Sequence, residues 1–323
     1  MRVVQAREFG GPEVLVTAEV PDPVAGPGEV VVAVAAVDTI FAETQIRAGV
    51  FGKHFTVQPP YVPGGGIAGT VRAVGRGVDE AWLGRRVITS LGPTGGYAEQ
   101  AVASAAKLVA IPDGLGLTEA AALIHDGVTA TALLEFTGLT AGERVLILGA
   151  SGGMGTLLVQ LAKAVGAQVV GVARGEAKVS LVRELGADAV VDATGDDWVG
   201  RARTALGAGG AQVVLDGVGG AMGLAAFALT ADGGRFSAHG APTGDFAQVD
   251  AAVAERRGIK LLGIADVQLS DGEYVRLAAK ALGEAAGGRL RPVIGGTFPL
   301  SGAADAHRAI EGRGLLGKAL LVG

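Results

Sequence analysis

The stretch Leu148-Gly149-Ala150-Ser151-Gly152-Gly153-Met154-Gly155 decides the fold of this chain. It completes an apolar run, Arg144–Ala150, that is typical of a buried strand, and it opens a helical pattern over Met154–Val165. Glycines in such a turn let a ligand approach the backbone, and the start of the helix offers N–H groups and the positive end of its dipole. A strand, a glycine turn and a helix in this order predict a site for the pyrophosphate of a dinucleotide.

Beyond this turn, the chain repeats the alternation of strand and helix. A helical pattern over Glu176–Leu185 is followed by further apolar segments of strand length. Such alternation is typical of a parallel sheet with helices on both faces. The expected strands are Gln168–Ala173, Ala189–Val191, Ala211–Leu215, Arg235–Ala238 and Ile259–Ile264.

The chain before residue 120 has a different pattern. Short apolar segments separated by Gly and Pro predict a β-rich domain of barrel or sandwich type. After Asp271, two helical stretches and a last strand, Ala319–Val322, indicate a return to this first domain. We therefore predict an α/β protein with a first domain over 1–122, a dinucleotide-binding domain over 123–265 and a returning segment over 266–323. The expected strands of the first domain are Glu29–Val37, Ala68–Val74, Arg86–Thr89, Tyr97–Val102 and Leu108–Ile111.

Composition narrows the classes of function. The length of 323 residues suits two domains, and 49% apolar residues allow a large core. The net charge of −5 argues against nucleic acid as a partner, and the absence of cysteine excludes disulfides and thiolate metal sites. No apolar run is long enough to span a membrane, and Met1–Glu8 lacks the apolar core of a signal peptide. We expect a cytoplasmic protein with no membrane partner.

The end of the second strand of a dinucleotide-binding domain selects the cofactor. An acidic residue there accepts hydrogen bonds from the ribose of NAD, whereas a basic residue accommodates the 2′-phosphate of NADP. Here the strand ends in Arg174-Gly175, and Lys178 lies one turn further on. Arg174 and Lys178 therefore favour NADP(H), with ordinary surface charges as the alternative.

The glycine turn also fits a second motif. Gly149–Gly153 matches the G-x-S-x-G turn of α/β-hydrolases, with Ser151 as the nucleophile and Asp216 and His239 following in the required order. That motif does not require Gly155, and the strands that normally precede it are missing. The dinucleotide interpretation is therefore favoured.

Histidine spacing predicts no metal site. His54, His125, His239 and His307 are far apart, and no cysteine accompanies them. We expect His307 to be structural, whereas His54 and His125 are the two that could reach a cleft.

Short motifs spread along the chain form a recognisable series. They are Thr44–Gly49, Pro60–Gly64, Val74–Val78, Gly95–Glu99, Ile111–Asp113, Ala120–Ala122, Thr129-Ala130, Gln160–Lys163, Leu185–Asp188, Val214–Gly219 and Gly317-Lys318. Over nearly its whole length, the chain resembles the zinc-independent quinone oxidoreductase (zeta-crystallin-like) branch of the medium-chain dehydrogenase/reductase superfamily. Where zinc-containing relatives have a metal-holding G-H-E stretch, this chain has Gly64-Gly65-Gly66.

The resemblance implies a GroES-like β-barrel domain and a Rossmann domain, with NADPH in the cleft between them. It also implies a homodimer formed by edge strands of the Rossmann sheets. The implied activity is NADPH-dependent reduction of a quinone or related conjugated carbonyl, without metal. The implied cofactor-binding residues are Thr129, Ser151, Gly152, Gly153, Met154, Arg174, Lys178, Asp216, Val218, Gly240, Ala241, Ile264 and Arg313.

The chain departs from the family pattern in three places. Many relatives have V-N-x-x-D, where this chain has Ile40 for the asparagine and Glu43 for the aspartate. A tyrosine that often follows the third Rossmann strand is Ala193 here, which removes an aromatic contact near the adenosine. His125-Asp126 is more polar than the small residues usual before Thr129.

The expected reaction is direct hydride transfer from NADPH to a conjugated acceptor. A quinone is readily protonated from solvent, whereas an enone or enoyl thioester gains more from a positioned proton donor. The substrate-pocket candidates are Glu43, His54, Tyr61 and His125, of which the last three are candidate proton donors. An enone or enoyl reductase, and an NADPH-binding protein without catalysis, are the alternatives.

Overall fold

The computed structural model describes residues 1–50 and 56–323. The predicted pocket residue His54 therefore lies outside the described residues. The chain forms two compact units, each described by itself. The first unit contains Met1–Val128, Leu269–Gly288 and Pro292–Gly323, and the second contains Thr129–Gln268 and Arg289–Arg291.

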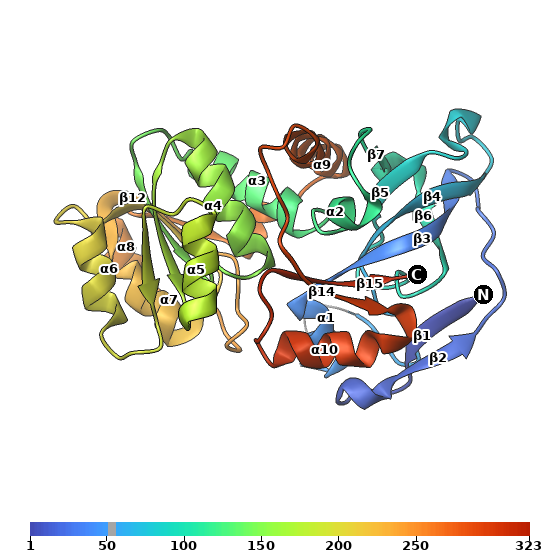
Figure 1. Ribbon diagram of the computed structural model, residues 1–323, viewed down its shortest axis with the longest axis horizontal. Helices are drawn as coiled ribbons and strands as arrows, with labels where there is room; N and C mark the ends of the chain where they lie inside the picture. Colours follow the sequence, from blue (N-terminus) through green and yellow to red (C-terminus); the bar gives the residue numbers. More distant parts are fainter. Residues whose placement is uncertain (51–55) are drawn as a thin grey trace. The chain divides into compact units, whose positions relative to one another are not determined.

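The described residues of the first unit form a curved sheet of seven strands (Figure 1). Its order is β14-β15-β3-β4-β5-β7, and β6 pairs with β3. Register shifts between β3 and β4 let these long strands bend around a core that includes Val30, Ile67 and Tyr97. The strands are β3 (Glu29–Thr39), β4 (Gly66–Val74), β5 (Arg86–Ser90), β6 (Gln100–Ser104), β7 (Val109–Ala110), β14 (Ile294–Pro299) and β15 (Lys318–Val322).

Further elements complete the first unit. A separate antiparallel pair, β1 (Arg2–Ala6) and β2 (Leu15–Glu19), is tied to the loops by isolated bridges such as Val3 to Ala98. The last strand, β15, runs antiparallel to β3 with Leu320 opposite Asp38. The helices are α1 (Phe41–Arg47), α2 (Leu117–Ala121), α9 (Asp271–Ala286) and α10 (Ala303–Glu311), and α3 (Asp126–Thr137) begins here and continues into the second unit.

The second unit, described throughout from Thr129 to Gln268, contains a parallel sheet of six strands in the order β10-β9-β8-β11-β12-β13. If β8 is counted as the first strand, this is the 3-2-1-4-5-6 order of a doubly wound dinucleotide fold. Successive strands are added on one side of β8 up to β10 and then on its other side from β11 onward, so the order reverses between β8 and β11. Helices flank the sheet on both sides (Figure 1). The strands are β8 (Arg144–Leu148), β9 (Gln168–Ala173), β10 (Ala189–Asp192), β11 (Ala211–Asp216), β12 (Thr230–Ala238) and β13 (Lys260–Gly263). The helices are α4 (Gly153–Val165), α5 (Glu176–Glu184), α6 (Trp198–Leu206), α7 (Gly220–Phe227) and α8 (Ala251–Arg256).

Glycine geometry explains the connection from β8 to α4. The strand ends at Leu148 because Gly149 adopts a positive φ of 68°, which favours glycine. A Cβ at Gly155 would lie 2.1 Å from the carbonyl oxygen of Gly149, so the helix packs directly on the turn. The predicted strand–turn–helix unit and the α/β class with its β-rich first domain are thus confirmed.

One predicted strand, Tyr97–Val102, is wrong at its start. The strand begins at Gln100, because the N–H groups of Gly96 and Tyr97 donate to the carbonyl oxygens of Gly64 and Pro63 instead of to a neighbouring strand. This segment therefore fastens the Pro63–Gly66 loop. Among the described residues, no helix is long and apolar enough to cross a membrane.

Candidate active site

The predicted cofactor residues of the second unit gather at one edge of its sheet. Ser151–Met154 follow β8, Arg174 follows β9, Val218 follows β11, and Gly240 with Ala241 follows β12. All of these strands are parallel, so their carboxyl ends lie at the same edge. This is the edge, beside the reversal of strand order, where doubly wound folds bind their ligands.

The start of α4 provides free N–H groups there. Its N-cap, Gly152, has no side chain to accept hydrogen bonds from the first turn. A Cβ at Gly152 would meet the protein only at the Gly149 oxygen, 3.4 Å away, so the backbone is open to close approach. Ser151 is buried, whereas Gly153 and Met154 are half-buried. Geometry and dipole at this helix start suit a pyrophosphate.

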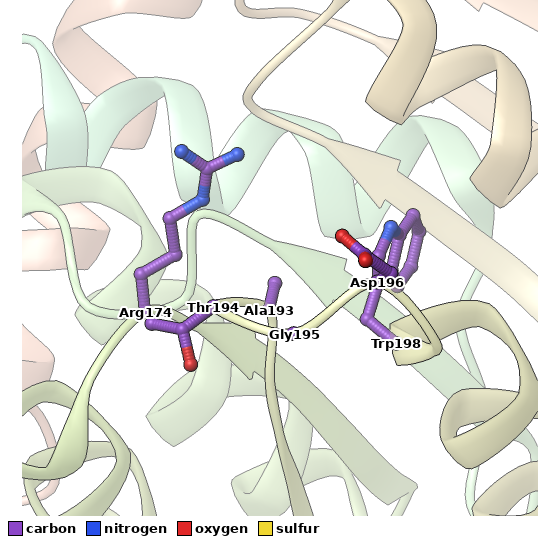
Figure 2. Close-up of a pocket in the computed structure, with 6 residues that line it drawn as sticks. All are labelled: Arg174, Ala193, Thr194, Gly195, Asp196 and Trp198. Carbon is purple, nitrogen blue, oxygen red and sulfur yellow. The ribbon is translucent and has the colours of Figure 1, made fainter.

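A pocket of about 540 Å³ is lined by residues that follow β9 and β10, and Figure 2 shows Arg174 and Trp198 on opposite sides of it. Asp192, at the end of β10, joins the loops that follow β9 and β10 by accepting hydrogen bonds from the N–H groups of Gly175 (3.0 Å) and Thr194 (2.9 Å). These two bonds lower the pKa of Asp192 and keep its carboxylate charged. The lining residues are Arg174, Ala193, Thr194, Gly195, Asp196 and Trp198.

Trp198 was missed by the sequence reasoning. It opens α6, six positions after β10, and its half-buried indole packs partly against the core of the second unit. Ala193, where relatives often have tyrosine, leaves room in the same pocket. The only signal in the sequence was an aromatic residue in a charged, exposed stretch. Lys178 does not line the pocket; it lies half-buried on α5.

Asp216 stabilises the turn that follows β11. It is fully buried, and its Oδ1 accepts hydrogen bonds from the N–H groups of Val218 and Gly219, both at 2.9 Å. Burial raises the pKa of Asp216, although these bonds oppose the shift. Its carboxylate therefore shapes the loop that presents Val218 and does not itself reach the surface.

The hydrolase interpretation finds no support in these contacts. The Asp216 carboxylate accepts a hydrogen bond from the backbone N–H of Val218 in the turn that follows it. His239 Nδ1 lies 3.4 Å from Ser237 Oγ, so the polar contact of this ring is with Ser237 and not with Asp216. Burial lowers the pKa of His239 to about 4.

A Cβ at Gly240 would lie 2.4 Å from the carbonyl oxygen of Gly217, so glycine is required where the chain leaves β12 beside the end of β11.

The remaining predicted cofactor residues are more scattered. Thr129 is half-buried on α3, and Ile264 is exposed at the start of the short 3-10 helix Ile264–Val267 that follows β13. Arg313 belongs to the first unit and has a positive φ of 54°, which is uncommon for any residue but glycine.

The first unit contains a buried ionic cluster, which we call the Lys318 cluster: Asp38, His125, Asp126 and Lys318. The Lys318 ammonium pairs with Asp38 Oδ1 and with Asp126 Oδ2, at 2.9 Å. Asp38 Oδ2 accepts from the backbone N–H of His125 at 3.0 Å and lies 2.8 Å from its Nδ1. The Lys318 ammonium on β15 thus connects β3, which carries Asp38, with the start of α3, which carries Asp126. Only His125 is appreciably exposed, with 26% of its side chain accessible.

In the Lys318 cluster, the neighbouring opposite charges outweigh the effect of burial on the pKa values of Asp38 and Lys318. Burial alone would raise the pKa of Asp38, but Lys318 and His125 outweigh it and lower that pKa to about 2. Burial would likewise lower the pKa of Lys318, yet Asp126 and Asp38 raise it well above its usual value. The pKa of His125 is raised because its hydrogen bond to Asp38 outweighs the effect of burial.

Glu43, a predicted pocket residue, is buried in a second polar network. Its Oε1 accepts from the Gly65 N–H at 2.8 Å, and its Oε2 accepts from the Tyr97 hydroxyl at 2.9 Å. That hydroxyl also lies 2.8 Å from Nε2 of the fully buried His307. Burial raises the pKa of Glu43, although the hydrogen bonds from Gly65 and Tyr97 act to lower it. Glu43 and His307 therefore hold α1 and α10 to the loop around Gly65.

Tyr61, another candidate, has an enclosed hydroxyl. The ring is half-buried against the core, and among the described residues its oxygen has no hydrogen-bond partner. Burial raises the pKa of Tyr61 to about 12. This side chain is therefore a packing residue with a firmly held proton.

Metal binding does not fit these residues. Over residues 1–50 and 56–323, no group of three or more His, Asp or Glu side chains could hold a metal ion. The carboxylates of Asp38 and Asp126 already hold the Lys318 ammonium, and Gly64–Gly66 offers no side-chain ligand.

Comparisons with known proteins agree with this architecture. Residues 26–113 match the alcohol dehydrogenase GroES-like domain, and residues 153–279 match the zinc-binding dehydrogenase family. Human quinone oxidoreductase is 31% identical, with 100% of this chain and 98% of that protein covered. A 2-haloacrylate reductase from a Burkholderia species is 32% identical, covering 97% and 96%. A mycobacterial structure solved with NADPH covers all of both chains at 31% identity, with a TM-score of 0.91. The chain thus belongs to the quinone oxidoreductase (zeta-crystallin-like) family of the medium-chain dehydrogenase/reductase superfamily.

Proposed function

We propose that this protein is an NADPH-dependent reductase that transfers hydride to a quinone or related conjugated carbonyl. The observation that carries the proposal is the sheet edge of the second unit, where the open start of α4 and the Arg174 pocket follow adjacent strands. The first suits a pyrophosphate, and the second suits an adenosine with a 2′-phosphate. Bound there, NADPH would supply the hydride.

Arg174 is the proposed contact of the 2′-phosphate, with Lys178 nearby. The guanidinium of Arg174 is exposed and lines the pocket, so a dianionic phosphate can reach it without displacing a buried partner. Trp198, across the pocket, offers a flat surface in place of the tyrosine absent at Ala193. The carboxylate of Asp196 lies on the Trp198 side (Figure 2).

We propose that the reaction needs no metal. Lys318 already supplies a positive charge between the carboxylates of the first unit, and the chain has no cysteine. The remaining polar groups can orient a carbonyl and move protons, which is the contribution expected of the protein when a nicotinamide supplies the hydride.

The second candidate acceptor is an enone or an enoyl thioester. It is favoured by the similarity to a 2-haloacrylate reductase, whose name denotes a conjugated acid as substrate. The polar pair His125-Asp126 adds to this, because a carbon acceptor gains more from a nearby proton donor than a quinone does.

The direct test is anaerobic consumption of NADPH and of NADH by the purified protein, with matched panels of quinones and α,β-unsaturated carbonyls. We expect NADPH-selective turnover of at least one panel. Tight NADPH binding without turnover of either panel would favour a binding protein over an enzyme. Failure to bind NADPH would overturn the proposal.

We further propose a homodimer formed through β13. This strand lies at the edge of its six-stranded sheet, and Leu261 and Ile264 are exposed there, at 37% and 41%. An apolar sheet edge suits pairing with a second copy. In size-exclusion chromatography with light scattering, the wild type should have the mass of two chains, and Leu261→Lys should shift it toward one. A monomeric wild type would contradict the proposal.

A further inference from the structure

Two glycines make room for the His125 ring in the first unit. A Cβ at Gly65 would lie 3.3 Å from His125 Nε2, and a Cβ at Gly66 would lie 2.7 Å from its Cε1. A residue with a side chain at Gly66 would therefore clash with the ring. The His125 ring thus fills the space that side chains at positions 65 and 66 would otherwise occupy.

Asp38 fixes the direction of this ring. It accepts from the His125 backbone N–H and lies within hydrogen-bond distance of Nδ1, so one carboxylate orients both the main chain and the side chain. A carboxylate on Nδ1 requires that this nitrogen carry a proton. Nε2 is then the nitrogen left to exchange a proton with a ligand, and the side chain is 26% exposed.

The charges around the ring favour its protonated form. Lys318 compensates one of the two carboxylates that it contacts, so Asp38, Asp126 and Lys318 together carry one negative charge. The pKa of His125 is accordingly raised above its usual value. The charged groups that shift the pKa of the ring are Asp38 on β3 and Glu43 on α1, which raise it, and Lys318 on β15, whose ammonium lowers it. Asp126, the next residue along the chain, pairs with that ammonium.

We propose that His125, oriented by Asp38, is the proton donor to the carbonyl oxygen of a conjugated acceptor. This inference rests on the proposed function and names its catalytic acid. NADPH, when bound, would supply hydride to the β-carbon of the acceptor, and the electrons of the carbon–carbon double bond would shift to form an enolate. Nε2–H of His125 protonates the enolate oxygen, and the enol then takes a proton from water at its α-carbon and releases its hydroxyl proton.

The balance is one acceptor, one NADPH and one proton giving the saturated carbonyl compound and NADP⁺. Water returns the proton to His125 after each turnover. Asp38 acts as a positioning residue, because it holds the ring and does not touch the acceptor. A quinone that accepts hydride becomes a hydroquinone monoanion, which solvent can protonate, so the proposal assigns α,β-unsaturated carbonyls as the acceptor class that depends on His125.

The test compares two variants with the wild type. His125→Asn keeps an amide N–H near the position of Nδ1 for Asp38, and His125→Gln places one near Nε2, but neither side chain titrates. General acid catalysis contributes about 10²–10⁴-fold. We expect kcat for enones to fall at least about 100-fold in both variants, while kcat for quinones falls by less than about tenfold. Wild-type kcat for enones should decline as pH rises through the raised pKa of His125, and this decline should disappear in the variants.

His307→Gln is the matched control, because it removes a buried imidazole of the same unit. It should keep both the ratio of enone to quinone turnover and the decline at high pH, whatever it does to the melting temperature. Equal losses for both acceptor classes in the His125 variants, or an unchanged pH profile, would overturn the assignment of His125 alone. Wild-type protein that reduces neither class would overturn the proposed function as well.

Discussion

Replacing Lys318 with methionine is expected to lower the free energy of unfolding by about 3–5 kcal/mol, the usual cost of removing one partner from a buried ion pair. Methionine fits the space of the lysine stem but leaves Asp38 and Asp126 without their shared ammonium. Lys318 is only 5% exposed, so water does not readily take its place. Chemical denaturation at pH 7, followed by circular dichroism, measures the effect.

The deficit of the Lys318 variant should depend on pH. Asp38 in the wild type has a pKa of about 2, below its unfolded value, so it stabilises the fold above pH 4 and this contribution is lost as pH falls toward 2. In the variant, burial without the Lys318 ammonium raises the pKa of the Asp38 carboxyl, so its protonation relieves the penalty and the gap between the proteins should narrow steadily as pH falls toward 2.

Lys163→Met is the control for this experiment. Lys163 pairs with Asp188 in the second unit, but both side chains are partly exposed, and such pairs contribute at most about 1 kcal/mol. If the Lys318 and Lys163 variants lost the same small amount, the Lys318 cluster would not be a tightly coupled ionic site.

Arg174→Ala should weaken NADPH binding by roughly ten- to a hundredfold and leave NADH binding within about twofold. A charge-assisted contact between a guanidinium and a phosphate contributes about 1.5–3 kcal/mol, and only NADPH carries the 2′-phosphate. Isothermal titration calorimetry with both nucleotides gives the two dissociation constants. The selective loss should diminish at high salt, because the contact is exposed.

Arg183→Ala is the matched control for the Arg174 variant. Arg183 is in the last turn of α5 and does not line the Arg174 pocket. Its removal should change neither dissociation constant by more than about twofold. An Arg174 variant that loses NADPH and NADH equally would show that this side chain acts on the shared part of the cofactor, or on the fold.

The second unit was predictable because its signals are local. The apolar run of β8, the glycine turn and the amphipathic α4 are consecutive in the chain, and Gly152 and Gly155 make their close contacts with Gly149 in the same turn. Arg174 could be placed for the same reason, since a parallel sheet brings every strand end to one edge. Whether Arg174 and its neighbours bind cofactor stays a prediction.

The first unit was less predictable because its decisive contacts join distant segments. Asp38 and Lys318 meet only because β15 pairs with β3, and no short spacing signals that pairing. β14 was not predicted, since Gly295, Gly296 and Pro299 weaken its pattern. Trp198 was missed for a different reason: a single aromatic residue at a helix start has no period, and only the adjoining loop makes it a pocket wall.

The pairing of β15 with β3 has a consequence for the order of events during synthesis. Strand β3 is made early, whereas Lys318 is added only after the whole second unit, at about 5–20 residues per second. Until then, Asp38 lacks its main cation and the edge of β3 that will receive β15 is uncovered. The second unit, whose strands are all made before Lys318, can complete its sheet first. A chain truncated just before Lys318 would thus retain the six-stranded sheet of the second unit, while the sheet of the first unit would lack β15.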